Sequence, residues 1–163
     1  MAHIVRRVRQ AGVYFVTSRT WQSRAWFRKP EAAQILIEQL LSCRDRGFYK
    51  LHEFVVMPDH FHALLTPSED TSLEKAMQMI KGGSSRRISE ELSHKLPVWQ
   101  SGFHDRWIRD RQEYEARVQY IHSNPVAAKL ADTPEEYILS SACGKYSLDP
   151  SAFGQRTSGA KAP

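Results

Sequence analysis

The sequence predicts a small α+β domain in which strands and helices follow the order β-α-β-β-α-β, with one more helix after the last strand. Three observations lead to this prediction. The chain has 163 residues, 41% of them hydrophobic, which is enough for one domain with a sizeable core. Stretches rich in β-branched and aromatic residues alternate with stretches whose apolar residues recur at helical spacing. Proline and glycine stand between these stretches, where chain reversals and helix ends are expected.

The first strand and the first helix lie within the N-terminal third of the chain. Residues 13–20, VYFVTSRT, mix β-branched and aromatic residues in near alternation and predict a strand. Pro30 opens a helix, because proline is favoured in the first helical turn. Gly47 ends that helix, since glycine readily adopts the left-handed conformation in which helices stop.

A hairpin follows the first helix. Residues 48–57, FYKLHEFVVM, predict the second strand, and residues 60–66, HFHALLT, predict a third strand antiparallel to it. Pro58 and Asp59 form the tight turn between them, because proline fixes φ at the first central position of a turn.

The second helix and the fourth strand come next. Thr71 and Glu74 form a capping-box pattern ahead of a helical stripe of leucine, methionine and isoleucine. Gly82 and Gly83 interrupt this stripe at a cost of roughly 1–2 kcal/mol relative to alanine, so a local structural reason is expected. Residues 97–110 predict the fourth strand.

A third helix and a tail complete the chain. Residues 112–124 predict a helix that stops before Pro125, because the residue preceding a proline avoids helical torsion angles. Hydrophobic periodicity then disappears, so residues 146–163 are expected to be a disordered tail and residues 1–145 the domain. The order of the elements is that of the ferredoxin-like, or split βαβ, arrangement, an antiparallel sheet with helices on one face.

Composition and charge limit the class of protein. No apolar run approaches the length of a membrane span, no signal peptide is evident, and Cys43 and Cys143 form no CxxC pair, so we expect a cytoplasmic protein without membrane contact. The net charge is +5, and seven basic residues precede the first acidic one, Glu31. This asymmetry favours a polyanionic partner such as nucleic acid, while a generic basic surface that aids solubility is the alternative.

Residues 57–67, MPDHFHALLTP, carry two histidines in an otherwise apolar segment. Side chains alternate across a strand, so His60 and His62 face one side and Phe61 the other. Two imidazoles on one face can bind a divalent cation if a third protein group approaches. Alternatively, one histidine caps the turn and the other is a hydrogen-bonded interior residue. A histidine-triad nucleotide hydrolase is excluded, because Leu64 stands where the third histidine is required.

The third helix supplies a second pair of polar residues. Tyr120 and Asn124 are four residues apart and therefore neighbours on one helical face. A tyrosine phenol can attack a phosphodiester to give a covalent phosphotyrosine, and asparagine offers a neutral oxygen to a hard cation. The alternatives are a tyrosine packed on the sheet and an asparagine that caps a following helix. Tyr114 is a rival nucleophile, but it lies on a different helical face.

These two segments together carry a family resemblance. His60-Phe61-His62 after Met57-Pro58-Asp59, with YIHSNP at 120–125, resembles the HUH single-tyrosine transposases, most closely their REP-associated tyrosine transposase branch. The similarity extends from about residue 13 to residue 142 and includes VWQ at 98–100, FHD at 103–105 and SSA at 140–142.

The resemblance implies metal-dependent cleavage and rejoining of single-stranded DNA at hairpin-bearing repeat or element ends, the chemistry of DNA transposition. It implies that Tyr120 is the nucleophile, forming a 5′-phosphotyrosine, and that His60, His62 and Asn124 bind Mg²⁺ or Mn²⁺. A nicking or replication-initiator nuclease with the same chemistry and a non-catalytic module that binds repeat hairpins are the alternatives. A monomer is expected, with a homodimer as the alternative.

Further residues are candidates for contact with the DNA. Basic side chains near the N-terminus and beside the glycine pair are candidates for phosphate contacts, the alternative being a solvated surface: Arg6, Arg7, Arg9, Lys81, Arg86 and Arg87. His104 and Asp105 are candidates for a pair that supports the site, or else form a local hydrogen bond at a strand end. Trp99 and Trp107 can stack on unpaired bases, but core packing is favoured for both.

Overall fold

Four strands form one antiparallel sheet in the order β2-β3-β1-β4 in the computed structural model, which describes residues 9–95 and 97–154. The helices and strands follow the chain as predicted, and the arrangement is ferredoxin-like. The strands are β1 (Tyr14–Arg19), β2 (Tyr49–Met57), β3 (His60–Pro67) and β4 (His104–Trp107). The helices are α1 (Pro30–Asp45), α2 (Leu73–Leu92) and α3 (Arg111–Ala127).

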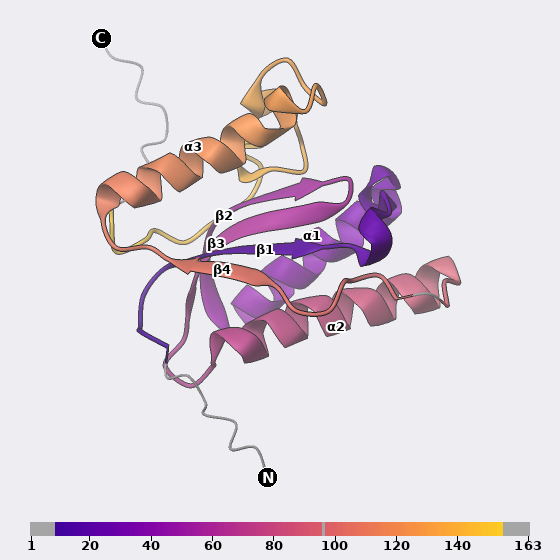
Figure 1. Cartoon of the computed structure of the whole chain (residues 1–163), viewed down its shortest axis with the longest axis horizontal. Coiled ribbons are helices and arrows are strands. Elements are labelled where there is room, and N and C mark those ends of the chain that lie inside the picture. Colours follow the sequence, from indigo (N-terminus) through magenta and orange to yellow (C-terminus); the bar gives the residue numbers. More distant parts are fainter. Residues whose placement is uncertain (1–8, 96, 155–163) are drawn as a thin grey trace.

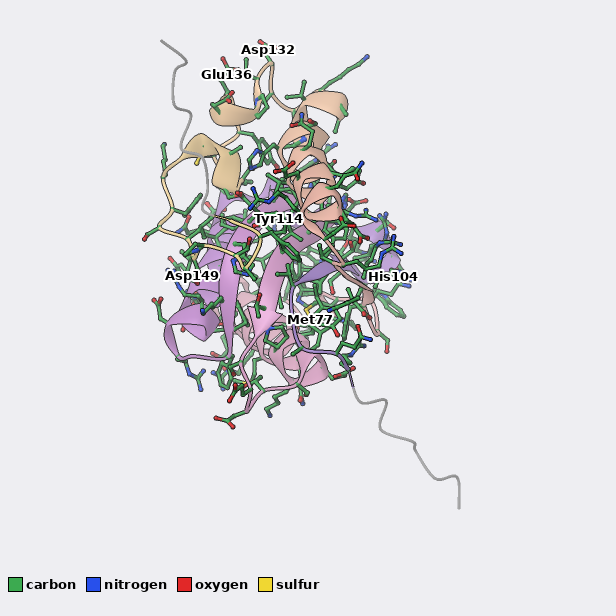
Figure 2. The ribbon with its side chains drawn as sticks, turned by 90° about the vertical axis from the view of Figure 1, so that its left-hand side faces the viewer. Met77, His104, Tyr114, Asp132, Glu136 and Asp149 are labelled. Carbon is green, nitrogen blue, oxygen red and sulfur yellow. The ribbon has the colours of Figure 1, made fainter. Side chains whose placement is uncertain are left out.

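The two faces of the sheet carry different helices. Helices α1 and α2 lie side by side on one face, and α3 crosses the other (Figures 1 and 2). The larger apolar core lies under α1 and α2, whereas a smaller cluster lies under α3 and includes Phe15, Val55, Leu64 and Ile121. Within the described chain, no helix is long and apolar enough to cross a membrane.

The turn between β2 and β3 is held from both sides. Met57 pairs with His60 across the turn, as the Pro58-Asp59 signal predicts. The backbone N–H of Thr20 donates to the carbonyl of Asp59 at 2.9 Å. The carbonyl of Pro58 accepts a second hydrogen bond from a backbone N–H. The two bonds together fix the start of β3 in place.

Helix α2 differs from the prediction in its cap and in its continuity. Ser72, not Thr71, is the N-cap, and its hydroxyl accepts a hydrogen bond from the Lys75 N–H. The helix runs unbroken through both glycines. A Cβ on Gly83 would lie 2.0 Å from Nε2 of Gln39 on α1, so the close approach of the two helices is the local reason for a glycine here.

Helix α3 does not stop before Pro125 but continues to Ala127. Asn124 is therefore inside α3 and is not the N-cap of a following helix. Its backbone carbonyl accepts a hydrogen bond from the N–H of Ala128 at 3.0 Å. The restriction on the residue before a proline is a bias, and burial of the Pro125 ring against the sheet offsets it here.

The expectation of a disordered tail is wrong for residues 146–154, and residues 155–163 lie outside the described part of the chain. The backbone of Asp149 pairs with Leu51 on the outer edge of β2, at 2.9 Å. The ring of Tyr146 lies 5.0 Å from that of Phe54. The segment is irregular, but its partly buried Tyr146, Leu148 and Phe153 pack against the two apolar clusters.

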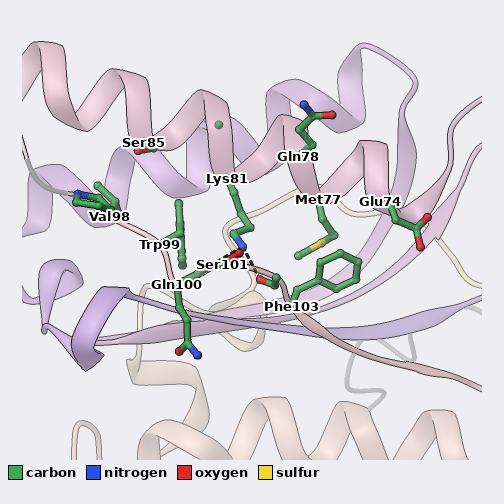
Figure 3. A pocket seen from close by; sticks show the side chains of 13 residues that line it. Glu74, Met77, Gln78, Lys81, Ser85, Val98, Trp99, Gln100, Ser101 and Phe103 are labelled. Carbon is green, nitrogen blue, oxygen red and sulfur yellow. Dashed lines mark hydrogen bonds between the residues drawn. The ribbon is translucent and has the colours of Figure 1, made fainter. Parts of the chain in front are cut away.

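The fourth strand is shorter than predicted, covering His104–Trp107 rather than residues 97–110. Residues 97–103 join the sheet edge through a bridge between Trp99 and Thr20 and a bond from the N–H of Gln100 to the carbonyl of Arg19, without forming a regular strand. This segment instead lies against α2 (Figure 3).

Candidate active site

His60 and His62 share the face of the sheet that α3 crosses, as the alternation predicts, while Phe61 is buried in the core on the other face. The two imidazole centroids are 4.8 Å apart. His62 is buried, and its ring stacks on Phe15 at 5.1 Å. The sheet therefore presents both imidazoles together at one place.

Each histidine is oriented through its Nδ1 atom. The Nδ1 atom of His60 lies 2.7 Å from a carboxylate oxygen of Asp59, and that of His62 lies 2.7 Å from the hydroxyl of Thr17. The Nε2 atom of His62 is buried and has no hydrogen-bond partner among the described residues. Metal-binding histidines usually have one nitrogen held in this way and the other free.

His62 is neutral at physiological pH. The pKa of His62 is lowered to about 3, mainly by burial, and the neighbouring His60, Arg19 and Arg117 contribute to this shift in the same direction. A neutral imidazole keeps a lone pair on one nitrogen, which is the form that binds a cation.

Tyr120 reaches the histidine pair from α3 of the same chain. Its ring lies 5.3 Å from that of His62 and 6.0 Å from that of Phe15. Tyr120 is nevertheless 49% exposed, so its side chain is accessible from solvent. Tyr114, the rival, packs on Phe153 under the helix, with its ring 5.6 Å away.

Asn124 lies one turn beyond Tyr120 on the same helix and is partly buried. No hydrogen bond engages its side-chain amide within residues 9–95 and 97–154. In the same part of the chain, no three histidine, cysteine or acidic side chains converge on one point. A three-ligand cation site at the histidines would therefore need a donor of another kind, such as an amide or hydroxyl oxygen.

Two arginines beside the site were missed as site residues by the sequence reasoning. Arg19 is paired with His60 in the register of β1 and β3 and is exposed. Arg117 places its guanidinium 4.7 Å from the centre of the Phe15 ring, three residues before Tyr120. Arg117 could have been found from the sequence, because it is three residues from Tyr120 on the same helix. Arg19 could be placed at the site only from the register of the strands.

The N-terminal candidates have other partners or lie outside the described residues. Arg6 and Arg7 belong to residues 1–8, which the structure does not describe. Arg9 forms ion pairs with Glu74 and with Asp105, the latter at 2.5 Å. These contacts hold Arg9 between α2 and β4 and do not leave it directed toward a phosphate.

His104 and Asp105 do not form the expected pair. His104 is opposite Thr17 in the strand register, on the face of the histidine site, and lies at the exposed edge of the sheet (Figure 2). Asp105 points to the other face and binds Arg9. His104 alone remains near the site, where it lines a cavity of about 70 Å³ together with Thr17 and Arg19.

The candidates on α2 are engaged to different degrees. Lys81 donates to the carbonyls of Gln100 and Gly102, at 2.9 Å and 2.5 Å (Figure 3). Arg87 forms ion pairs with acidic residues on α1 and α2. Arg86 is exposed and has no ion pair within the described residues. Of these three candidates, Arg86 is therefore the one whose charge has neither an acidic partner nor a carbonyl partner in the described part of the chain.

A larger cavity lies away from the histidines. It measures about 440 Å³ and separates α2 from residues 97–103 (Figure 3). Trp99 borders it but is buried, and its Nε1 donates to the hydroxyl of Ser84, so core packing is confirmed as its role. Trp107 is 36% exposed and donates to the carbonyl of Ala11.

Comparisons with known proteins show relatives of this chain among transposases. The REP-associated tyrosine transposase of Escherichia coli K12 is 31% identical over 87 residues, which are 51% of this chain and 47% of that protein, so the match spans about half of the relative. The structure of a REP-associated tyrosine transposase bound to a REP hairpin has the same fold, with a TM-score of 0.70, 22% identity and coverage of 96% of this chain and 98% of that one. A putative transposase from Deinococcus radiodurans R1 has a TM-score of 0.53 and 23% identity, over 71% of this chain and 92% of that one.

The family model described as "Transposase IS200 like" matches residues 11–124, a span that contains the four strands, the histidine pair and most of α3 with Tyr120. The chain thus belongs to the IS200-like transposase family.

Proposed function

We propose that this protein cleaves and rejoins single-stranded DNA beside a hairpin, with Tyr120 as the nucleophile. The observation that carries the proposal is the position of the exposed Tyr120 ring, 5.3 Å from the buried His62 ring in the same chain. Because both rings belong to one chain, a monomer is the proposed active form. The proposed substrate follows the relatives, one of which is named for its association with REP sequences and another of which was solved with a REP hairpin.

His60, His62 and Asn124 would hold Mg²⁺ or Mn²⁺. When bound, such a cation polarises the scissile phosphate and supports the developing negative charge. Asp59 and Thr17 fix the two imidazole rings through their Nδ1 atoms, so the rings need no reorientation on binding. The Nε2 atom of His62, which has no hydrogen-bond partner among the described residues, supports this assignment.

The reaction is a transesterification at phosphorus. The phenolic oxygen of Tyr120 attacks the phosphate and loses its proton, and the bond to the 3′-oxygen breaks, which releases a 3′-hydroxyl end. The 5′-phosphotyrosine keeps the energy of the phosphodiester, so a second 3′-hydroxyl can attack it and restore Tyr120. Arg19 and Arg117 lie beside the histidines and are suited to stabilise the charge on the phosphate.

The cytoplasm is the proposed site of action. DNA is the substrate, and Cys43 and Cys143 are both free thiols, as is usual in a reducing compartment.

A covalent-trapping experiment tests the proposal. A hairpin oligonucleotide with a 3′ label and a single-stranded flank is incubated with Mn²⁺ and the wild-type protein, and the products are separated under denaturing conditions. We expect a labelled protein–DNA adduct in the wild type, none after addition of EDTA, and none in Tyr120→Phe. Tyr114→Phe is the matched control, because it removes a phenol from the same helix but on the side that packs on Phe153.

Two results would contradict the proposal. Full turnover by Tyr120→Phe would exclude this tyrosine as the nucleophile. Hairpin binding without an adduct in either protein would favour a binding module without catalytic activity.

A further inference from the structure

A buried carboxyl group lies under α3, on the side away from the histidines. Glu53 on β2 is 1% exposed and is the only buried acidic side chain within the described residues. We propose that Glu53 and His122 together set the rotation of α3 about its axis and thereby hold Tyr120 and Asn124 at the histidine pair. Their role in the reaction rests on the proposed function; their role in holding the helix does not.

Glu53 connects the helix to a fixed part of the molecule. Its Oε2 atom lies 3.0 Å from Nε2 of His122 on α3, and it also accepts a hydrogen bond from the hydroxyl of Ser141. Ser141 is buried and itself bound to β2, because its hydroxyl accepts from the N–H of Phe54 at 3.0 Å. The carboxyl group is therefore held in one position from which it contacts the helix.

The position of His122 on the helix explains why it controls rotation. Each residue advances an α-helix by about 100°, so His122 projects about 160° away from both Tyr120 and Asn124. Ile121 and Pro125, the buried residues of α3, lie between these two directions. The helix thus rests on an apolar stripe, with the contact to His62 on one flank and the contact to Glu53 on the other.

Apolar packing alone defines this rotation poorly. Only Ile121 and Pro125 are buried along the whole of α3, Tyr114 and Val118 are partly buried beside them, and apolar contacts have little directional preference. A hydrogen bond between charged or polar groups depends on angle as well as distance. Side-chain ends lie about 5–6 Å from the axis, so a rotation of 10° moves them by about 1 Å, enough to slow a reaction by about 100-fold.

His122 and Glu53 are positioning residues in this scheme, since neither touches the reacting atoms. Loss of the pair should therefore reduce the rate of cleavage after DNA has bound, but not the binding of the hairpin. A residue that merely stabilises the fold would reduce the folded fraction and change neither the rate of the folded protein nor the local order of α3.

The test compares His122→Ala with His122→Gln, which keeps a side-chain N–H near the position of Nε2. The side chain of His122 is 24% exposed, so both variants are expected to fold. Tyr49→Phe is the matched control, because it removes a buried hydrogen bond from the other face of β2, between the Tyr49 hydroxyl and the carbonyl of Leu40. Single-turnover cleavage at saturating hairpin, hairpin Kd and amide hydrogen exchange are measured for each protein.

We expect His122→Ala to lower the single-turnover rate by about 10–100-fold with a Kd within about threefold of wild type, and His122→Gln to recover most of the rate. Amide exchange in residues 117–127 should become about tenfold faster in His122→Ala and remain unchanged in Tyr49→Phe. The double variant Glu53→Ala/His122→Ala should be no slower than the slower single variant, because the two residues act as one unit.

Wild-type rate and wild-type exchange in His122→Ala would overturn the inference, as would an equal loss of rate in Tyr49→Phe. If the wild type forms no adduct at all, the proposed function fails, but the exchange measurement still decides whether this pair holds the helix.

Discussion

Replacing Thr17 by valine is expected to weaken cation binding at the histidine pair without unfolding the protein. Thr17 lies on β1 directly opposite His62, and its hydroxyl is 2.7 Å from Nδ1 of that ring. His62 is neutral, so only one of its nitrogens carries a proton. When Nδ1–H donates to the hydroxyl, the lone pair is on Nε2, the buried atom without a partner among the described residues. Valine has nearly the same shape but cannot accept this hydrogen bond.

The magnitude follows from the loss of this one hydrogen bond. Removing a group that orients a ligating histidine typically weakens metal binding about 10–100-fold, which corresponds to about 1.4–2.7 kcal/mol. The change in the free energy of unfolding of the metal-free protein should be smaller, because valine fills the same space and favours strands.

Calorimetric titration of the metal-free protein with Mn²⁺ measures the effect. Thr17→Ser is the control, since it keeps the hydroxyl, and it should bind Mn²⁺ within about threefold of wild type. If Thr17→Val binds Mn²⁺ as tightly as wild type does, either His62 is not a ligand or Thr17 does not orient it, and the reasoning fails.

Three further predictions concern stability and DNA binding. Burial lowers the pKa of His62 to about 3, so between pH 6.5 and pH 3 the unfolded chain takes up a proton at this residue and the folded chain does not. The contribution of His62 to the free energy of unfolding is therefore complete above pH 6.5 and is lost as the pH falls toward 3. By pH 5 the free energy of unfolding in EDTA should fall by about 2 kcal/mol, and His62→Gln should reduce this loss, as urea denaturation at pH 7.5 and pH 5 will show. Gly82→Ala should raise the free energy of unfolding by up to about 1 kcal/mol, because nothing lies within 4 Å of the added Cβ. Gly83→Ala should not raise the free energy of unfolding, because the added Cβ displaces Gln39. The two variants should therefore differ in Tm in a thermal denaturation experiment. Arg86→Ala should weaken hairpin binding and reduce the slope of log K against log salt by about 0.9, with no change in Tm.

The order of strands and helices could be predicted from the sequence because local patterns determine it. The alternation in residues 13–20 and the Pro58-Asp59 turn each depend on a few adjacent residues, and both predictions are confirmed. The shared face of His60 and His62 follows from strand geometry alone. The same local rules failed where tertiary contacts dominate, as at Pro125, which is buried inside α3, and in the irregular segment around Asp149.

The supporting residues of the site could not be predicted in the same way, because they come from separate parts of the chain. Thr17 meets His62 through the pairing of β1 with β3, and Glu53 meets His122 across 69 positions of sequence. The approach of Gln39 to Gly83 likewise depends on how two helices pack. Sequence patterns therefore found the residues that carry the chemistry, whereas the residues that orient them required the folded chain.

The pairing of the C-terminal segment with β2 has a practical consequence. The backbone of Leu139 accepts from the N–H of Val56 at 2.8 Å, and Asp149 pairs with Leu51 further along the same strand. An open strand edge is a template on which a second chain can add, leading to aggregates. A shortened version that ends at residue 145 would uncover part of this edge, so preparations for biophysical work should retain the chain through Phe153.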